Sequence, residues 1–225
     1  MIAESRSSLI HRYLDPASSL GEVLFGLIMT LTFTLGAGII IENQGREGAR
    51  ELLIAVIGCN IAWGIIDGAL YLAGQLFDRG RLRRLAQAVR DTADQRLAVT
   101  LIAGELDALL EHVTDVPERE ALYVRIATNL RSSPFRPNTI RKADVLGAVT
   151  SFWLVVLSSI PAAIPFVFID DARFALRVSN AILLVALFIT GYSWARHTLG
   201  KPWLVGLSFL IGGMALVTMS IALGG

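Results

Sequence analysis

The sequence contains only one cysteine, Cys59, and three histidines. A single cysteine forms neither an intramolecular disulfide nor a cysteine-based metal site, which excludes a disulfide-linked scaffold. Charged residues account for 17% of the chain, whereas soluble domains carry about 25%. The first 20 residues lack the apolar core and the small-residue cleavage site of a signal peptide, so we expect the first apolar helix to be retained.

Motifs of common enzyme classes are missing from the sequence as well. It has no phosphate-binding loop, no nucleophile elbow and no helix with the paired histidines of a zinc enzyme. No nucleophile–base pair stands out either. We therefore predict that the protein is not an enzyme, and we expect no covalent cofactor.

Long apolar segments dominate the chain. Hydrophobic residues make up 54% of it, and the mean hydropathy is +0.59. Five apolar segments lie at roughly 23–41, 52–77, 145–169, 174–195 and 202–224. Each is close to the ~20 residues that a helix needs to cross the hydrocarbon core. We therefore predict an all-α polytopic membrane protein with five transmembrane helices.

The charged residues divide the chain into four parts. We expect a cytoplasmic N-terminal segment (1–22), transmembrane helices 1 and 2 (23–77), a helical cytoplasmic domain inserted between helices 2 and 3 (78–144), and transmembrane helices 3 to 5 (145–225). Asp15-Pro16 or Ser18–Ser19 is expected to cap the first helix, and the polar residues 42–51 are expected to form a short external turn.

The distribution of basic residues predicts the orientation. Twelve of them lie between Arg79 and Lys142, whereas only two lie in each of the two loops on the other side. Cytoplasmic loops carry an excess of Lys and Arg, so we expect the N-terminus in the cytoplasm and the C-terminus outside. The expected location is a bacterial inner (plasma) membrane.

The inserted domain reads as helices. Leucines recur at helical spacing from Leu82 to Leu110, and Asp115-Val116-Pro117 is a typical helix start. Four arginines directly follow the second apolar segment: Arg79, Arg81, Arg83 and Arg84. We expect these arginines to meet anionic lipid headgroups at the inner leaflet. Nucleic acid is not an expected partner, because aromatic residues are scarce there.

The second apolar segment holds one carboxylate, Asp67. A charged side chain at the centre of a bilayer costs about 2.5–3.5 kcal/mol on insertion scales, so it is expected to face protein or water. At helical steps, one polar and small stripe is formed by Asn60, Gly64, Asp67, Tyr71, Gly74 and Asp78. In the first segment, Glu22, Gly26 and then Met29 or Thr30 follow one another in the same way.

These stripes predict an ion or proton path. Its expected residues are Asp67, Asn60, Tyr71, Glu22, Met29 and Thr30, with Asp67, Met29 and Glu22 as the expected metal ligands. A buried acid carries a proton or binds a cation, and Met29 would add a soft ligand for a transition metal. In the alternative, Asp67 is a neutral, hydrogen-bonded acid that joins helices, and Met29 only packs.

A weaker metal site is predicted in the inserted domain. Asp107 and Glu111 lie four residues apart, which places both carboxylates on one helical face. A hard or borderline cation could bridge them. The alternative is a solvated face, because arginines that can pair with these acids are abundant nearby.

Three stretches carry a resemblance to a known family: EVLFGLIMTLTFTLGAG (22–38), RKADVLGAVTSFWLVVLSSIPAAIPFVFI (141–169) and GYSWARHTLGKPWLVGLSFLIGGMALVTMSIALGG (191–225). Together with the layout of two spans, a helical domain and three spans, they resemble the vacuolar iron transporter family. The resemblance implies a homodimer that exchanges Fe²⁺ or Mn²⁺ for protons, with glutamate-rich cytoplasmic helices that gather metal.

The chain departs from two motifs of that family. A Gly-x-x-Asp-Gly motif in the first span corresponds to Gly26–Thr30, where Met29 takes the place of the acid. A Ser-Met…Gly-Glu motif in the second span is replaced by Gly64–Gly68, which contains Asp67. The alternative function is a non-transporting membrane scaffold whose cytoplasmic domain binds a partner or the inner leaflet. The scaffold predicts that the Asn60–Asp67–Tyr71 face is packed dry.

Overall fold

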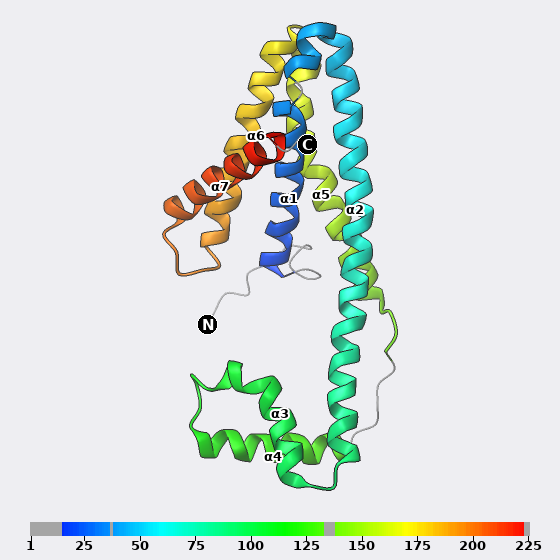
Figure 1. Ribbon diagram of the computed structural model, residues 1–225, viewed down its shortest axis with the longest axis vertical. Helices are drawn as coiled ribbons and strands as arrows, with labels where there is room; N and C mark the ends of the chain where they lie inside the picture. Colours follow the sequence, from blue (N-terminus) through cyan, green and yellow to red (C-terminus); the bar gives the residue numbers. More distant parts are fainter. Residues whose placement is uncertain (1–14, 37, 133–137, 223–225) are drawn as a thin grey trace, which may run out of the picture. The chain divides into compact units, whose positions relative to one another are not determined.

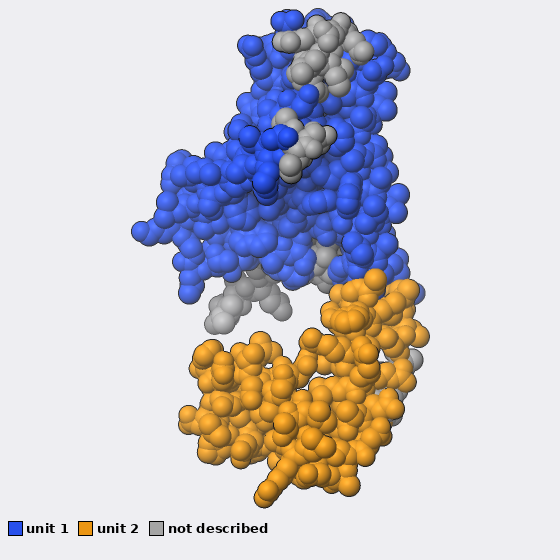
Figure 2. Space-filling view, in the orientation of Figure 1, with its two compact units in different colours: residues 1–72, 142–225 blue, residues 73–141 orange. Residues whose placement is uncertain are grey.

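The computed structural model describes residues 15–36, 38–132 and 138–222, and the regular elements there are all helices (Figure 1). They are α1 (Pro16–Gly36), α2 (Gly38–Asp91), α3 (Gln95–Leu110), α4 (Val116–Ser132), α5 (Lys142–Phe168), α6 (Ala172–Ala195) and α7 (Pro202–Ala222). The chain forms two compact units, coloured in Figure 2. Unit 1 is Met1–Leu72 with Lys142–Gly225, and unit 2 is Ala73–Arg141.

Four helices in the described part of the chain are long and apolar enough to cross a membrane: Pro16–Gly36, Gly45–Asp91, Lys142–Phe168 and Ala172–Ala195. The stretch Pro202–Leu216 of α7 is also apolar, but it is shorter than these four. The protein is therefore a helical membrane protein. The count of five spans stays a prediction.

The first helix begins earlier than its apolar segment. Asp15 caps it, because Oδ1 of Asp15 accepts a hydrogen bond of 2.9 Å from the backbone N–H of Ser18. Pro16 takes the first helical position, where its missing N–H costs nothing.

The chain turns within the expected segment 42–51, but the turn is confined to one residue. Gly45 has φ 56° and ψ −122°, and the residues on either side of it are helical. A positive φ of this size is accessible to glycine at no steric cost. The chain therefore changes direction at a single residue, and residues 46–51 are already helical.

In unit 1, α1, α5 and α6 share an apolar core of Leu27, Leu31, Ala162, Leu183 and Leu187. Helix α7 packs on α6 through glycines. A Cβ added at Gly191 would lie 2.7 Å from Phe209, and one added at Gly206 would lie 2.8 Å from Phe188. Small residues of this kind let helix backbones approach closely where no water is present to drive association.

Unit 2 contains the last part of α2 together with α3 and α4. Its core is Val89, Ala98, Ile102, Tyr123 and Ala127. The two predicted helices are confirmed as α3 and α4, and Asp94 caps α3 by accepting a hydrogen bond from the backbone N–H of Arg96. The proline-bearing stretch that follows α4 lies mostly outside the described residues.

Candidate functional site

The predicted stripe on α1 faces α5. Gly26 and Thr30 are buried, and the Thr30 hydroxyl donates a hydrogen bond of 2.7 Å to the carbonyl of Gly26. A Cβ added at Gly26 would lie 2.0 Å from Oγ of Ser158 and 2.8 Å from the carbonyl oxygen of Val155. The absence of a side chain at Gly26 therefore lets α1 and α5 meet backbone to backbone.

The predicted stripe on α2 is also turned inward. Asn60, Gly64 and Gly68 are buried, and Asp67 and Tyr71 are partly buried. A Cβ at Gly64 would lie 2.9 Å from the ring of Phe152, and one at Gly68 would lie 3.1 Å from the carbonyl oxygen of Ala148. The stripe thus packs against α5. Gly74 and Asp78, which the sequence pattern included, are exposed.

Asn60 joins α1 to α2. Its side chain is fully buried, and Nδ2 donates to Oγ1 of Thr30 at 3.2 Å and to the carbonyl oxygen of Val56 at 3.0 Å. Because a carbonyl oxygen only accepts, the contact with Val56 fixes which amide atom is the nitrogen. Oδ1 of Asn60 is then left buried without a hydrogen-bond partner among the described residues.

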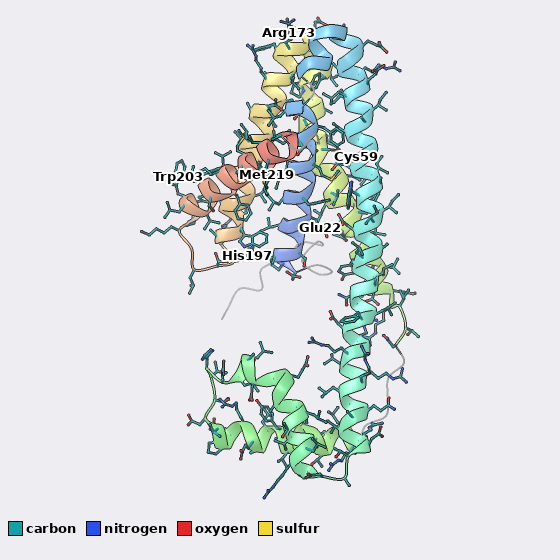
Figure 3. The ribbon with its side chains drawn as sticks, in the orientation of Figure 1. Glu22, Cys59, Arg173, His197, Trp203 and Met219 are labelled. Carbon is teal, nitrogen blue, oxygen red and sulfur yellow. The ribbon has the colours of Figure 1, made fainter. Side chains whose placement is uncertain are left out.

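Two carboxyl groups meet between α1 and α2. Glu22 lies near the start of α1 (Figure 3), and its carboxyl group lies beside that of Asp67 on α2. Oε1 of Glu22 also accepts a hydrogen bond of 2.8 Å from the hydroxyl of Ser151 on α5. Oδ2 of Asp67 is buried without a hydrogen-bond partner within the described part of the chain.

Two neighbouring carboxylates repel each other when both are ionised. A shared proton or a bound cation relieves that repulsion. A buried oxygen without a partner is also costly unless something binds it. The pair of Glu22 and Asp67, with the Ser151 hydroxyl, has the chemistry to hold a proton or a positive ion.

The other predicted path residues lie around this pair. Tyr71 follows Asp67 by one helical turn and packs on α5, where a Cβ at Gly147 would lie 2.5 Å from its ring and hydroxyl. Asn60 and Thr30 form the separate contact described above. Met29 is partly buried and lies two turns from Glu22 along α1. The structure thus places the carboxyl pair together and sets Met29 apart from it along the helix.

Ser151 was not among the residues expected from the sequence. It belongs to a stripe on α5 whose buried members recur at helical steps: Asp144, Gly147, Ala148, Ser151, Val155, Ser158, Ser159, Ala162 and Pro165. Applying the helical spacing used for α2 to this segment would have found it. Its partner on α1 could not be found in that way.

Asp107 and Glu111, the predicted weaker metal ligands in unit 2, both interact with neighbouring side chains. Oδ1 of Asp107 accepts a hydrogen bond of 2.6 Å from the Tyr123 hydroxyl and lies 3.6 Å from Nε of Arg119. Burial and this hydrogen bond raise the pKa of Tyr123. Glu111 lies 3.4 Å from Nε2 of His112. In residues 15–36, 38–132 and 138–222, no group of three or more His, Cys, Asp or Glu is placed to hold a metal ion.

Two of the four arginines at the start of unit 2 hold that unit together. Arg79 donates a hydrogen bond of 2.8 Å to the carbonyl oxygen of Thr139, and Arg81 forms an ion pair with Glu105. Arg83 and Arg84 are exposed. Two of the four basic residues that were expected to meet lipid headgroups therefore make contacts inside unit 2.

Comparison with known protein families shows which family the chain belongs to. The model of the VIT family matches residues 79–225, which is more than half of the chain. The chain belongs to the VIT family. This confirms the resemblance to the vacuolar iron transporters and makes the protein a member of a family of membrane metal-ion transporters, not of enzymes. No curated protein matches the chain.

The VIT match covers α3 to α7 and the end of α2, but it begins after the carboxyl pair. Glu22, Asn60 and Asp67 all precede Arg79. The match therefore includes α5, which packs against these residues, but not the residues themselves.

Proposed function

We propose that this VIT-family protein exchanges a divalent transition metal ion, Fe²⁺ or Mn²⁺, for protons at the carboxyl pair of Glu22 and Asp67. The observation that carries the proposal is the buried oxygen Oδ2 of Asp67, unpartnered among the described residues and next to a second carboxyl group. Either protons or one cation can satisfy the same pair, so the two compete for one site. Such competition is what proton-coupled exchange requires.

The donor atoms favour Mn²⁺ over softer metals. Glu22, Asp67 and Ser151 offer oxygen ligands, and carboxylate, hydroxyl and water ligands suit hard ions such as Mn²⁺. Met29, the soft ligand expected from the sequence, lies two helical turns from Glu22. We propose that Met29 acts later along the path or only packs.

The proposed arrangement in the membrane follows the basic residues. We place α7 as a fifth span, the N-terminus and unit 2 in the cytoplasm, and the C-terminus outside a bacterial inner membrane. The exposed Arg83 and Arg84 would meet anionic headgroups. A homodimer is the proposed assembly.

The test is transport by purified protein in proteoliposomes. Mn²⁺ and Fe²⁺ uptake and the opposite proton flux would be recorded for the wild type, Glu22→Gln, Asp67→Asn and the matched control Asp78→Asn. Asp78 lies on the same helix and is exposed. We expect both site variants to fall to the level of empty vesicles and the control to stay active. Equal transport by Asp67→Asn and Asp78→Asn would remove the carboxyl pair from the mechanism.

One observation favours a second function, a non-transporting scaffold. Gly64, Gly68 and Tyr71 pack directly on α5, as a dry contact between helices would. On this view the acid pair only joins helices. Wild-type protein would then move no divalent ion and no protons, while Asp67→Asn would still lower its thermal stability.

A further inference from the structure

A cavity of about 350 Å³ lies at one end of unit 1, where α2 begins, α5 ends and α6 begins (Figure 1). Its lining combines two guanidinium groups, two carboxylates and an apolar floor: Arg46, Glu47, Ala49, Arg50, Leu53, Phe166, Ile169, Asp170 and Ala172. Ligand sites typically have a mostly apolar lining with a few convergent polar groups and volumes from about 300 Å³. This cavity matches that description for a small polar headgroup.

The cavity lies at the surface of the membrane. Helices α5 and α6 are consecutive candidate spans joined by only three residues, 169–171, so their turn must emerge from the bilayer. The apolar floor continues onto exposed side chains of the same two helices, α2 and α5: Ile54 is 61% exposed, Val167 72% and Phe168 81%. Exposed apolar side chains next to a polar cavity are where lipid tails would lie beneath a headgroup.

The charged side chains that line the cavity form two pairs of opposite sign. Nη1 of Arg46 lies 3.1 Å from Oδ1 of Asp170, and Nη1 of Arg50 lies 3.4 Å from Oε1 of Glu47. The four side chains are mostly exposed, and exposed ion pairs are weak, so they can rearrange onto the charges of a ligand. The lining as a whole is neutral, with both signs available at short range.

We propose that this cavity binds the headgroup of a zwitterionic phospholipid that carries a primary amine, as in phosphatidylethanolamine. Its phosphate would take the two arginines, since guanidinium groups bind phosphate in a bidentate manner. Its ammonium would donate to Glu47 and Asp170. A purely anionic headgroup would meet two uncompensated carboxylates, and a quaternary choline has no N–H to donate. The proposal is independent of metal transport.

The test is lipid retention by the full-length protein, measured by native mass spectrometry. Phosphatidylethanolamine, phosphatidylcholine and phosphatidylglycerol would be offered at equal concentration. We expect the first to be retained best by the wild type. Replacing both arginines (Arg46→Ala with Arg50→Ala) should weaken its retention more than about tenfold, because one lost hydrogen bond to a charged group already has about that effect. The matched control is Arg173→Ala, at the same end of unit 1 but outside the cavity lining (Figure 3).

A second variant gives a change of preference that misfolding would not produce. Replacing both carboxylates (Glu47→Gln with Asp170→Asn) leaves two arginines and should shift retention from phosphatidylethanolamine to phosphatidylglycerol. The proposal is overturned if wild-type protein retains phosphatidylglycerol as well as phosphatidylethanolamine. It is equally overturned if the carboxylate variant keeps the wild-type preference, or if the arginine variant retains as much lipid as Arg173→Ala.

Discussion

Ser151 on α5 donates a hydrogen bond of 2.8 Å to Oε1 of Glu22 on α1, although 129 positions separate the two residues in the chain. Ser151 is fully buried, and Glu22 also meets Asp67 on α2. Three helices therefore converge on one carboxyl group, and the serine holds that group in the direction of its partner acid.

Replacing this serine should loosen the acid pair. Ser151→Ala removes one hydrogen bond to a carboxyl group and should cost about 1–2 kcal/mol of stability. If Ser151 also binds the ion, the concentration of metal needed for half-maximal uptake rises. Thermal unfolding and metal-dependent uptake measure the two effects. The control is Ser208→Ala, because the exposed Ser208 hydroxyl donates only to Val205 of its own helix. Identical behaviour of the two variants would contradict a role for Ser151.

A methyl group at Gly26 should separate α1 from α5. Gly26→Ala places Cβ 2.0 Å from Oγ of Ser158 and 2.8 Å from a backbone carbonyl oxygen, which cannot rotate away. Overpacking of this kind costs about 1–3 kcal/mol. Gly74→Ala is the control, because a Cβ there meets nothing within 4 Å. Alanine should stabilise the helix at position 74 by about 0.5–1 kcal/mol. The melting temperature in detergent should fall for Gly26→Ala and rise for Gly74→Ala. If both variants shifted it in the same direction, the close approach of α1 and α5 at Gly26 would be refuted.

Tyr123 should make unit 2 sensitive to alkaline pH. Burial and the hydrogen bond to Asp107 raise its pKa above the ordinary value of 10.0. A raised pKa in the folded state means that this contribution to stability is complete below pH 10 and is lost as pH rises through the folded pKa. Hydrogen exchange of α3 and α4 should therefore accelerate above about pH 10, the ordinary tyrosine pKa. Tyr123→Phe should remove that alkaline step and lower the stability of unit 2 at neutral pH, because the hydrogen bond to Asp107 is lost. An unchanged pH profile in Tyr123→Phe would show that another group is responsible.

Asp15 should stabilise the start of α1 above acidic pH. Hydrogen bonds from the hydroxyl and the backbone N–H of Ser18 lower its pKa from the ordinary value of 3.8. A lowered pKa in the folded state means that the contribution is present above pH 3.8 and is lost as pH falls through the folded pKa. Asp15→Ala should cost about 1 kcal/mol of helix stability. Asparagine caps nearly as well, so Asp15→Asn should retain the cap without this acid dependence. Hydrogen exchange in the first turn of α1 would report both variants, and equal fraying in both would exclude the cap.

The inward face of α2 could be predicted from spacing alone. Asn60, Gly64, Asp67 and Tyr71 share one side because the helix repeats every 3.6 residues. Polar and small residues turn toward other helices because lipid cannot hydrogen-bond to them. The same spacing continued to Gly74, which is exposed. Periodicity tells which residues share a face, but it does not tell how far along the helix a neighbour covers that face.

Helix ends were harder to predict than helix faces. The polar residues 42–51 look like a loop by composition, yet the chain stays helical there apart from Gly45. Polarity reports exposure to water, and an exposed helix and an exposed loop are equally polar. The backbone conformation of one glycine decided where the chain turns, and composition carries no information about it.

The sequence by itself determined that this is a helical membrane protein of the vacuolar iron transporter kind, and that Asp67 lies on an inward face. Hydropathy and helical periodicity are local properties, so they can be read from neighbouring residues. Only the tertiary structure decided that Glu22 meets Asp67, that Ser151 supports Glu22 and that Thr30 pairs with Asn60. Those contacts depend on how each helix is rotated and how closely it approaches the next. The glycines at 26, 64 and 68 set that approach by packing on residues far away in the chain.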